Sequence, residues 1–213
     1  MDSKEKHKQA GYCRTGNAVI LPMTVARRVV SAITLALLVN LVCGTAVFAQ
    51  SASQEYGIKA AFLFNFAKFA TWPEDTFESD TDSFVIAVVG KNPFGNNLAQ
   101  TLTVKDRKIQ VKEMVAVDTK ARINALKNCH LVYVSPSEKD NVDSILALLR
   151  ELPILTVSDV KGFSTRGGMI ELVTVGKRIR FDVNMKPARA SGVELSSKLL
   201  RLARTVTDEK QKE

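Results

Sequence analysis

The residues best suited to bind a charged partner are basic side chains in the C-terminal part of the chain. Arg178 and Arg180 are two positions apart, so in a strand their guanidinium groups would share one face. Such a pair could bind a carboxylate, a phosphate or an acidic protein surface. A solvated face with local ion pairs, such as Arg180 with Asp182, is the alternative; each exposed pair would contribute only about 0–1 kcal/mol. The whole basic group comprises Arg166, Lys177, Arg178, Arg180, Lys186 and Arg189.

The sequence contains no recognisable catalytic or metal-binding pattern. His130 is the only histidine after position 7, whereas a metal site needs three or four ligands. Nucleophile-elbow, P-loop and dinucleotide-binding motifs are missing. The acidic segment 74–82 lacks the glycine and final glutamate of a calcium loop, and Cys129 lies in an apolar run typical of a core thiol. We therefore predict a protein that is not an enzyme and needs no cofactor or metal.

Residues 1–49 have the features of a secretory signal peptide. Arg27 and Arg28 precede an apolar run over 29–42, and Val47-Phe48-Ala49 offers a cleavage site before Gln50. The run is interrupted by polar residues and is short for a span of roughly 20 residues, which argues against an uncleaved anchor. A leader that starts at Met23 would also have ordinary proportions. We expect export to the periplasm through a cleaved signal peptide.

The exported part is long enough for one domain and only mildly basic. Removal of 49 residues leaves 164 of the 213, which suffices for a proper core. The leader carries six Lys or Arg and two Asp or Glu, so the net charge falls from +8 to about +4. This modest charge, together with export, argues against binding to nucleic acid. Only Cys129 remains of the three cysteines, so an internal disulfide is impossible.

The hydrophobic pattern predicts alternating strands and helices. Continuous apolar runs such as 84–90 are typical of strands buried on both faces, and this alternation favours a largely parallel sheet. The fold class is therefore α/β, a three-layer α/β/α sandwich with a C-terminal hairpin, in a single domain over 50–206 before a charged, mobile tail over 207–213. Strands are expected at 84–90, 108–112, 131–135, 152–158, 169–173 and 178–184. Helices are expected at 54–70, about 95–102, 121–126, 136–150 (opened by a Ser135–Glu138 capping box), 187–191 and 196–206.

The helix predicted over 54–70 holds four of the ten phenylalanines. Its main apolar face covers the sheet, and the stem of Lys59 could lie along that face while its ammonium group reaches water. Phe64 falls beside Lys68, away from the other aromatic residues. The two interpretations are a helix that only packs on the sheet, and one in which Phe64 and Lys68 contribute to a partner surface.

Four stretches resemble the YfiR family of exported bacterial proteins. They are Ile58 to Phe69 with Trp72-Pro73, Gly167 to Leu172, Arg178 to Asn184, and Ser196 to Ala203. The resemblance covers nearly all of 54–206. It implies a three-layer α/β/α fold, a dimer, and a periplasmic repressor that binds the periplasmic portion of an inner-membrane diguanylate cyclase. Binding would lower cyclic-di-GMP and biofilm formation, and an outer-membrane lipoprotein could sequester the repressor.

The leading hypothesis is therefore a non-enzymatic periplasmic regulator that represses a membrane signalling protein. Its candidate binding residues are Arg166, Arg178, Arg180, Arg189, Phe64 and Lys68. A second hypothesis is a sensor whose Arg178/Arg180 face takes a small anion, such as a nucleotide or an amino acid, and which acts on a membrane receptor. A third is an exported enzyme of unknown class. Some relatives carry cysteine pairs, but Cys129 alone excludes a switch based on an internal disulfide here.

Overall fold

The computed structural model describes residues 53–77, 79, 81–98, 103–114 and 125–208. The predicted leader lies outside these ranges, as do most of the helix expected over 121–126 and the end of the one expected over 95–102. Within the described ranges, no helix has the length and apolar character that crossing a membrane requires.

The core of the structure is an eight-stranded sheet with the order β10-β8-β7-β6-β5-β2-β4-β3. Its five central strands are parallel, whereas β8 runs antiparallel to β7, and β3 antiparallel to β4. The strands are β2 (Phe84–Val89), β3 (Thr103–Val104), β4 (Arg107–Met114), β5 (Leu131–Val134), β6 (Leu155–Ser158), β7 (Ile170–Val175), β8 (Arg178–Asn184) and β10 (Thr205–Thr207). A separate antiparallel pair joins β1 (Ala70–Thr71) to β9 (Glu194–Leu195).

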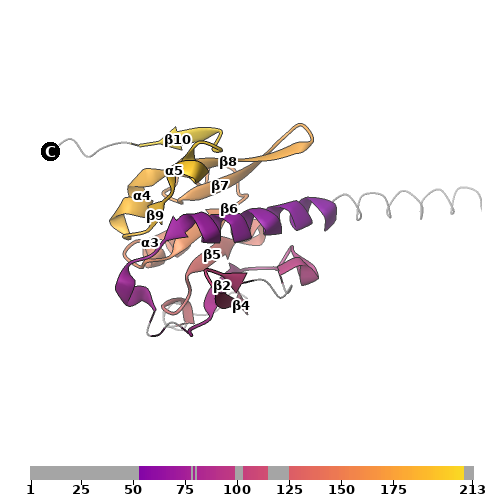
Figure 1. The fold of residues 1–213 in the computed structure, drawn as a ribbon. Coiled ribbons are helices and arrows are strands. Elements are labelled where there is room, and N and C mark those ends of the chain that lie inside the picture. Colours follow the sequence, from indigo (N-terminus) through magenta and orange to yellow (C-terminus); the bar gives the residue numbers. More distant parts are fainter. Residues whose placement is uncertain (1–52, 78, 80, 99–102, 115–124, 209–213) are drawn as a thin grey trace, which may run out of the picture. The chain divides into compact units, whose positions relative to one another are not determined.

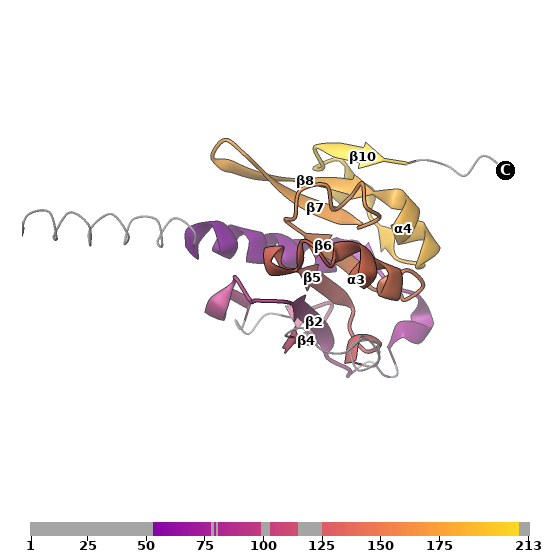
Figure 2. The ribbon, with the colours of Figure 1, turned by 180° about the vertical axis from the view of Figure 1, so that it is seen from behind.

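Helices cover both faces of the sheet, which confirms the predicted three-layer α/β fold. The first helix (53–69) crosses one face (Figure 1), and α3 (Val142–Leu149) lies on the other (Figure 2). Strand β2 shows why the central strands are apolar throughout. Phe84, Ile86 and Val88 join the cluster beneath the first helix, whereas Val85, Ala87 and Val89 join the cluster beneath α3. Further helices in the described ranges are α4 (Met185–Ala190), α5 (Ser197–Leu200), and the 3-10 turns η1 (Glu74–Thr76), η2 (Gly95–Leu98) and η3 (Pro136–Glu138).

The end of the chain differs from the prediction. Ser196 caps α5 as expected, its Oγ accepting a hydrogen bond from Leu199 N at 3.3 Å. That helix stops at Leu200 rather than near 206, and residues 205–207 form β10, which pairs in parallel with β8. Thr207 therefore belongs to the sheet, not to a tail. The residues Thr-Val-Thr favour an extended backbone, and pairing with β8 supplies the hydrogen bonds that a helix would have made.

The predicted capping box is also wrong. Pro136 to Glu138 form the separate turn η3, and α3 begins only at Val142. Ser135 Oγ makes no capping bond; it donates instead to Lys91 O at 2.7 Å. The serine thus ties β5 to the loop after β2.

Two expectations for the first helix are overturned. Lys59 does not reach water: only 4% of it is exposed, and its Nζ lies 2.6 Å from Asp159 Oδ2 and 2.7 Å from Glu55 Oε1. Phe64 is 8% exposed and belongs to the cluster beneath the helix. A partner surface built on Phe64 is therefore wrong, because the sheet and its helices cover more of the first helix than its own periodicity indicates. Lys68 is exposed as expected.

Cys129 and His130 are buried and lie directly before β5. The His130 ring stacks on Phe77 at 4.3 Å between centroids, and its Nδ1 accepts a hydrogen bond from Val85 N at 2.9 Å. Burial, followed by the nearby charge of Arg107, lowers the pKa of His130 to about 4. Burial raises the pKa of Cys129 to about 11, so the thiol stays protonated, as expected for a core cysteine.

The depressed pKa of His130 predicts that the protein loses stability in mild acid. The unfolded chain binds this proton near pH 6.5, but the folded protein binds it only near pH 4. The stabilisation is therefore complete above pH 6.5 and decreases as the pH falls, by about 2 kcal/mol at pH 5. Urea unfolding at pH 7, 6 and 5 measures it. His130→Asn keeps an acceptor for Val85 N but does not titrate, so this pH-dependent part should vanish; an unchanged slope would contradict the assignment.

Candidate functional site

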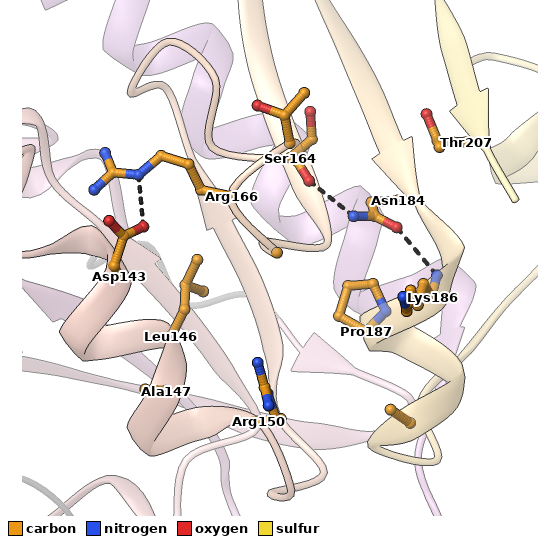
Figure 3. Close-up of a pocket in the computed structure, with 13 residues that line it drawn as sticks. Asp143, Leu146, Ala147, Arg150, Ser164, Arg166, Asn184, Lys186, Pro187 and Thr207 are labelled. Atoms are coloured by element: carbon orange, nitrogen blue, oxygen red, sulfur yellow. Dashed lines mark hydrogen bonds and ion pairs between the residues drawn. The ribbon is translucent and has the colours of Figure 1, made fainter. Parts of the chain in front are cut away.

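A cavity of about 860 Å³ lies between α3 and α4 (Figure 3). One wall is a helical stripe at the spacing i, i+3, i+4, i+7 on α3 and the residue that follows it: Asp143, Leu146, Ala147 and Arg150. The opposite wall comes from α4, with Lys186, Pro187 and Ala190. The loop residues 164–167, together with Asn184 and Thr207 at the ends of β8 and β10, complete the lining.

Buried Glu171 of β7 holds the loop that closes the cavity. Its carboxylate accepts hydrogen bonds from Gly162 N at 2.9 Å, from Ser164 N at 3.0 Å and from Ser164 Oγ at 2.8 Å. Phe163 points into the cluster beneath α3 and is fully buried. A Cβ on Gly168 would come within 2.2 Å of two atoms of the Phe163 ring, so this close approach requires glycine.

Asn184 connects the two elements on the other side of the cavity. Its Oδ1 accepts a hydrogen bond from Lys186 N at 3.1 Å and so caps α4, while its Nδ2 donates to Ser164 O at 2.8 Å. One side chain therefore fixes the end of β8, the start of α4 and the closing loop relative to one another. Both bonds are visible in Figure 3.

The charges that line the cavity are mostly positive. Arg166 Nε donates to Asp143 Oδ1 at 2.7 Å, and Arg166 Nη1 donates to Lys139 O at 3.0 Å. The hydrogen bond from Arg166 lowers the pKa of Asp143, so this carboxylate is ionised at neutral pH. Within the described part of the chain, neither Arg150 nor Lys186 has an ion-pair partner. The described residues of the lining thus carry three cations against one carboxylate.

The structure brings only part of the predicted basic group together. Arg166 and Lys186 line the cavity, but Arg178 and Arg180 lie in β8, beyond the Gly176-Lys177 turn of the β7–β8 hairpin, and are not among its lining residues. Arg189 of α4 is held by Asp208 through two hydrogen bonds, one of them from Nη2 to Oδ2 at 2.6 Å.

The hairpin presents Arg178 and Arg180 on the sheet face opposite the first helix. The antiparallel register places Arg178 across from Val175, Arg180 across from Val173, and Asp182 across from Glu171. Asp182 pairs with Arg204, which donates from Nε at 2.8 Å and also from Nη2, so the alternative pairing of Asp182 with Arg180 is wrong. Both carboxylates of this face are therefore engaged by other groups, and both arginines are exposed.

Sequence reasoning missed Arg150, Asn184 and Asp143 as residues of the cavity. The sequence predicts a helix over 136–150, and in it Arg150 falls on the same face as Asp143 and Leu146. That stripe was a usable signal for the α3 wall. The opposite wall had no such signal, because it depends on how α4 and the loop pack after the hairpin.

Among the residues that the structure describes, no group of three or more His, Cys, Asp or Glu side chains is placed to hold a metal ion.

One protein-family model matches the sequence over most of this fold. The YfiR/HmsC-like family model covers residues 56–204, from the first helix to the residue before β10. The chain belongs to the YfiR/HmsC-like family. Membership supports a regulatory rather than a catalytic role, and a periplasmic location.

Other comparisons add little to this assignment. A conserved domain protein from Vibrio cholerae O1 biovar El Tor has a solved structure that aligns with a TM-score of 0.45 and 13% identity. The alignment covers 58% of this chain and 54% of that one, so the chain spans about half the length of the protein it resembles. A search of curated proteins found no significant match.

The stretches that resemble the YfiR family occupy defined positions in this YfiR/HmsC-like protein. Ile58 to Phe69 belong to the first helix, and Gly167 to Leu172 with Arg178 to Asn184 form most of the hairpin. Ser196 to Ala203 include α5. The first helix and the hairpin pack on each other, since Phe62 and Phe66 contact Phe181 with ring centroids 5.8 and 5.0 Å apart.

Proposed function

We propose that this protein is a non-enzymatic periplasmic regulator that binds an inner-membrane signalling protein and holds it inactive. The partner is the periplasmic portion of a diguanylate cyclase, and repression lowers cyclic-di-GMP. The family match over 56–204 is the observation that carries this proposal. Two measurements test this proposal. One is a pull-down with the periplasmic domain of a diguanylate cyclase that is encoded next to this protein's gene, and the other is the cyclic-di-GMP level after deletion of this protein's gene. No binding and an unchanged cyclic-di-GMP level would refute it.

The β7–β8 hairpin is the surface that we propose for this contact. Arg178 and Arg180 are exposed on one face, and the carboxylates of that face, Glu171 and Asp182, bind the loop and Arg204 instead. Val175 is 48% exposed beside Arg178. A surface with two arginines and an exposed apolar residue suits a partner segment that carries carboxylates next to apolar side chains.

Charge reversal on the hairpin should weaken partner binding. The double variant Arg178→Glu/Arg180→Glu is expected to reduce affinity for the cyclase domain about 10- to 100-fold, because it places like charges at the contact. The matched control is Lys198→Glu/Arg201→Glu, which makes the same charge change on exposed residues at α5. Biolayer interferometry on purified proteins measures both. If both variants lost the same affinity, the effect would come from net charge alone, and the proposal that the hairpin contacts the partner would be wrong.

Self-association and sequestration complete the proposal. The resemblance supports a homodimer and an outer-membrane lipoprotein that competes with the cyclase for the regulator. Analytical ultracentrifugation at micromolar protein concentration should give the mass of a dimer. A purely monomeric species would refute the proposed homodimer.

A further inference from the structure

We propose that the cavity between α3 and α4 is a binding site for a small organic anion, a molecule with a carboxylate or phosphate group on an apolar body. At about 860 Å³ the cavity falls within the range of small-molecule sites, roughly 300–1,000 Å³. The site lies at the opposite end of β8 from Arg178 and Arg180, the pair at which the sequence alone would place an anion, and neither arginine lines it. It concerns binding by the isolated protein and stands or falls separately from repression of a cyclase.

The positive charge of the lining selects an anion. Arg150 and Lys186 come from opposite walls (Figure 3), and no described acidic group pairs with either of them. Arg166 uses Nε and Nη1 for Asp143 and for the Lys139 carbonyl, and no described group accepts from its Nη2. A concave surface that carries one sign of charge concentrates the electric field. The electrostatic contribution to the binding free energy of an anion is therefore larger here than on an open strand face.

The apolar part of the lining selects an organic anion over a bare inorganic one. Leu146 and Ala147 from α3 face Pro187 and Ala190 from α4, so both walls offer apolar surface. These residues can contact a ring or a short hydrocarbon chain while the cations bind the acidic group. The burial of that apolar surface adds affinity that inorganic phosphate could not obtain.

The cavity is also held in shape before any ligand arrives. Asn184 fixes α4 against the closing loop through two hydrogen bonds, and buried Glu171 fixes the loop through three. A ligand therefore need not order these segments, and that lowers the entropic cost of binding.

Asp143 has a specific place in this proposal. It is the only acidic side chain among the described residues of the lining, it is 72% exposed, and it neutralises Arg166. A bound anion would be repelled by this carboxylate and would compete with it for Arg166. Removal of its charge should therefore strengthen anion binding, an outcome that a merely structural role of the Arg166–Asp143 pair does not produce.

Calorimetry on the purified full protein tests the site with phenyl phosphate as the probe. Phenyl phosphate should bind with a Kd on the order of 1 mM or tighter. Inorganic phosphate should bind more weakly, and phenol should not bind measurably. Arg150→Gln and Lys186→Gln should each weaken binding about tenfold or abolish it, because each removes a charge-assisted hydrogen bond. Asp143→Asn should tighten binding about three- to tenfold.

Arg178→Gln is the matched control, since it removes one exposed arginine outside the cavity. It should leave phenyl phosphate binding unchanged. All four substitutions are at exposed positions, and thermal unfolding checks that each variant is folded. The proposal is overturned if the wild-type protein does not bind phenyl phosphate, if phenol binds equally well, or if Arg178→Gln weakens binding as much as Arg150→Gln does. Unchanged or weaker binding in Asp143→Asn would also overturn it.

Discussion

Replacement of Lys59 by methionine is expected to lower the free energy of unfolding by about 3–5 kcal/mol. Lys59 is almost fully buried, and its ammonium group pairs with Asp159, whose side chain is 7% exposed. Burial by itself lowers the pKa of Lys59, but hydrogen bonds to Asp159 and Glu55 outweigh it and raise the pKa overall, so the lysine is charged. Without the lysine, Asp159 would be left as a buried and uncompensated charge.

The neighbours of Asp159 explain why this loss should be large. Asp159 also accepts hydrogen bonds from Tyr56 OH at 3.1 Å and from Tyr133 OH. Burial and the negative charge of Asp159 raise the pKa of Tyr133, which therefore remains a hydrogen-bond donor. Tyr133 lies in β5, and Asp159 directly follows β6, so the network ties the first helix to the ends of two central strands.

Urea unfolding of Lys59→Met measures the effect, with Glu55→Gln as the control. Glu55 binds the same ammonium group, but its side chain is 37% exposed, so its loss should cost no more than about 1 kcal/mol. The double variant Lys59→Met/Asp159→Asn should recover part of the loss, because it removes the uncompensated charge. A loss below 1 kcal/mol in Lys59→Met would mean that the pair does not hold the helix on the sheet.

Truncation of Phe64 to alanine should lower the free energy of unfolding by about 3 kcal/mol or more. The ring is 8% exposed and lies in the cluster that the first helix forms with the sheet. Its removal leaves a cavity that the surrounding helix and strands fill only in part. Thermal or urea unfolding measures the change.

Lys68→Ala provides the comparison for Phe64→Ala, since Lys68 is one turn along the same helix but exposed. Its effect should stay within about 0.5 kcal/mol. If Phe64→Ala left stability intact and instead weakened binding to a cyclase domain, the ring would belong to a partner surface after all.

The sequence by itself determined the elements whose pattern is local. The run Phe84 to Val89 is apolar at every position because both faces of β2 are covered, and this made a buried strand predictable without its neighbours. The alternation in Arg178 to Asn184 likewise separated the face that packs on the first helix from the one that carries the arginines. Arg178 to Asn184 is also one of the four stretches that carry the family resemblance, and the match over 56–204 confirms that resemblance.

Only the tertiary structure decided which distant groups meet. Lys59 and Asp159 are 100 positions apart, and the helical pattern around Lys59 could not reveal a carboxylate behind β6. Residues 205–207 pair in parallel with the edge of β8 and therefore form β10, where the sequence predicts the end of a helix. The cavity likewise joins Arg150, Arg166 and Lys186 from three separate segments. Spacing along the chain reports the face of one element, whereas a site built across elements depends on packing that no single stretch encodes.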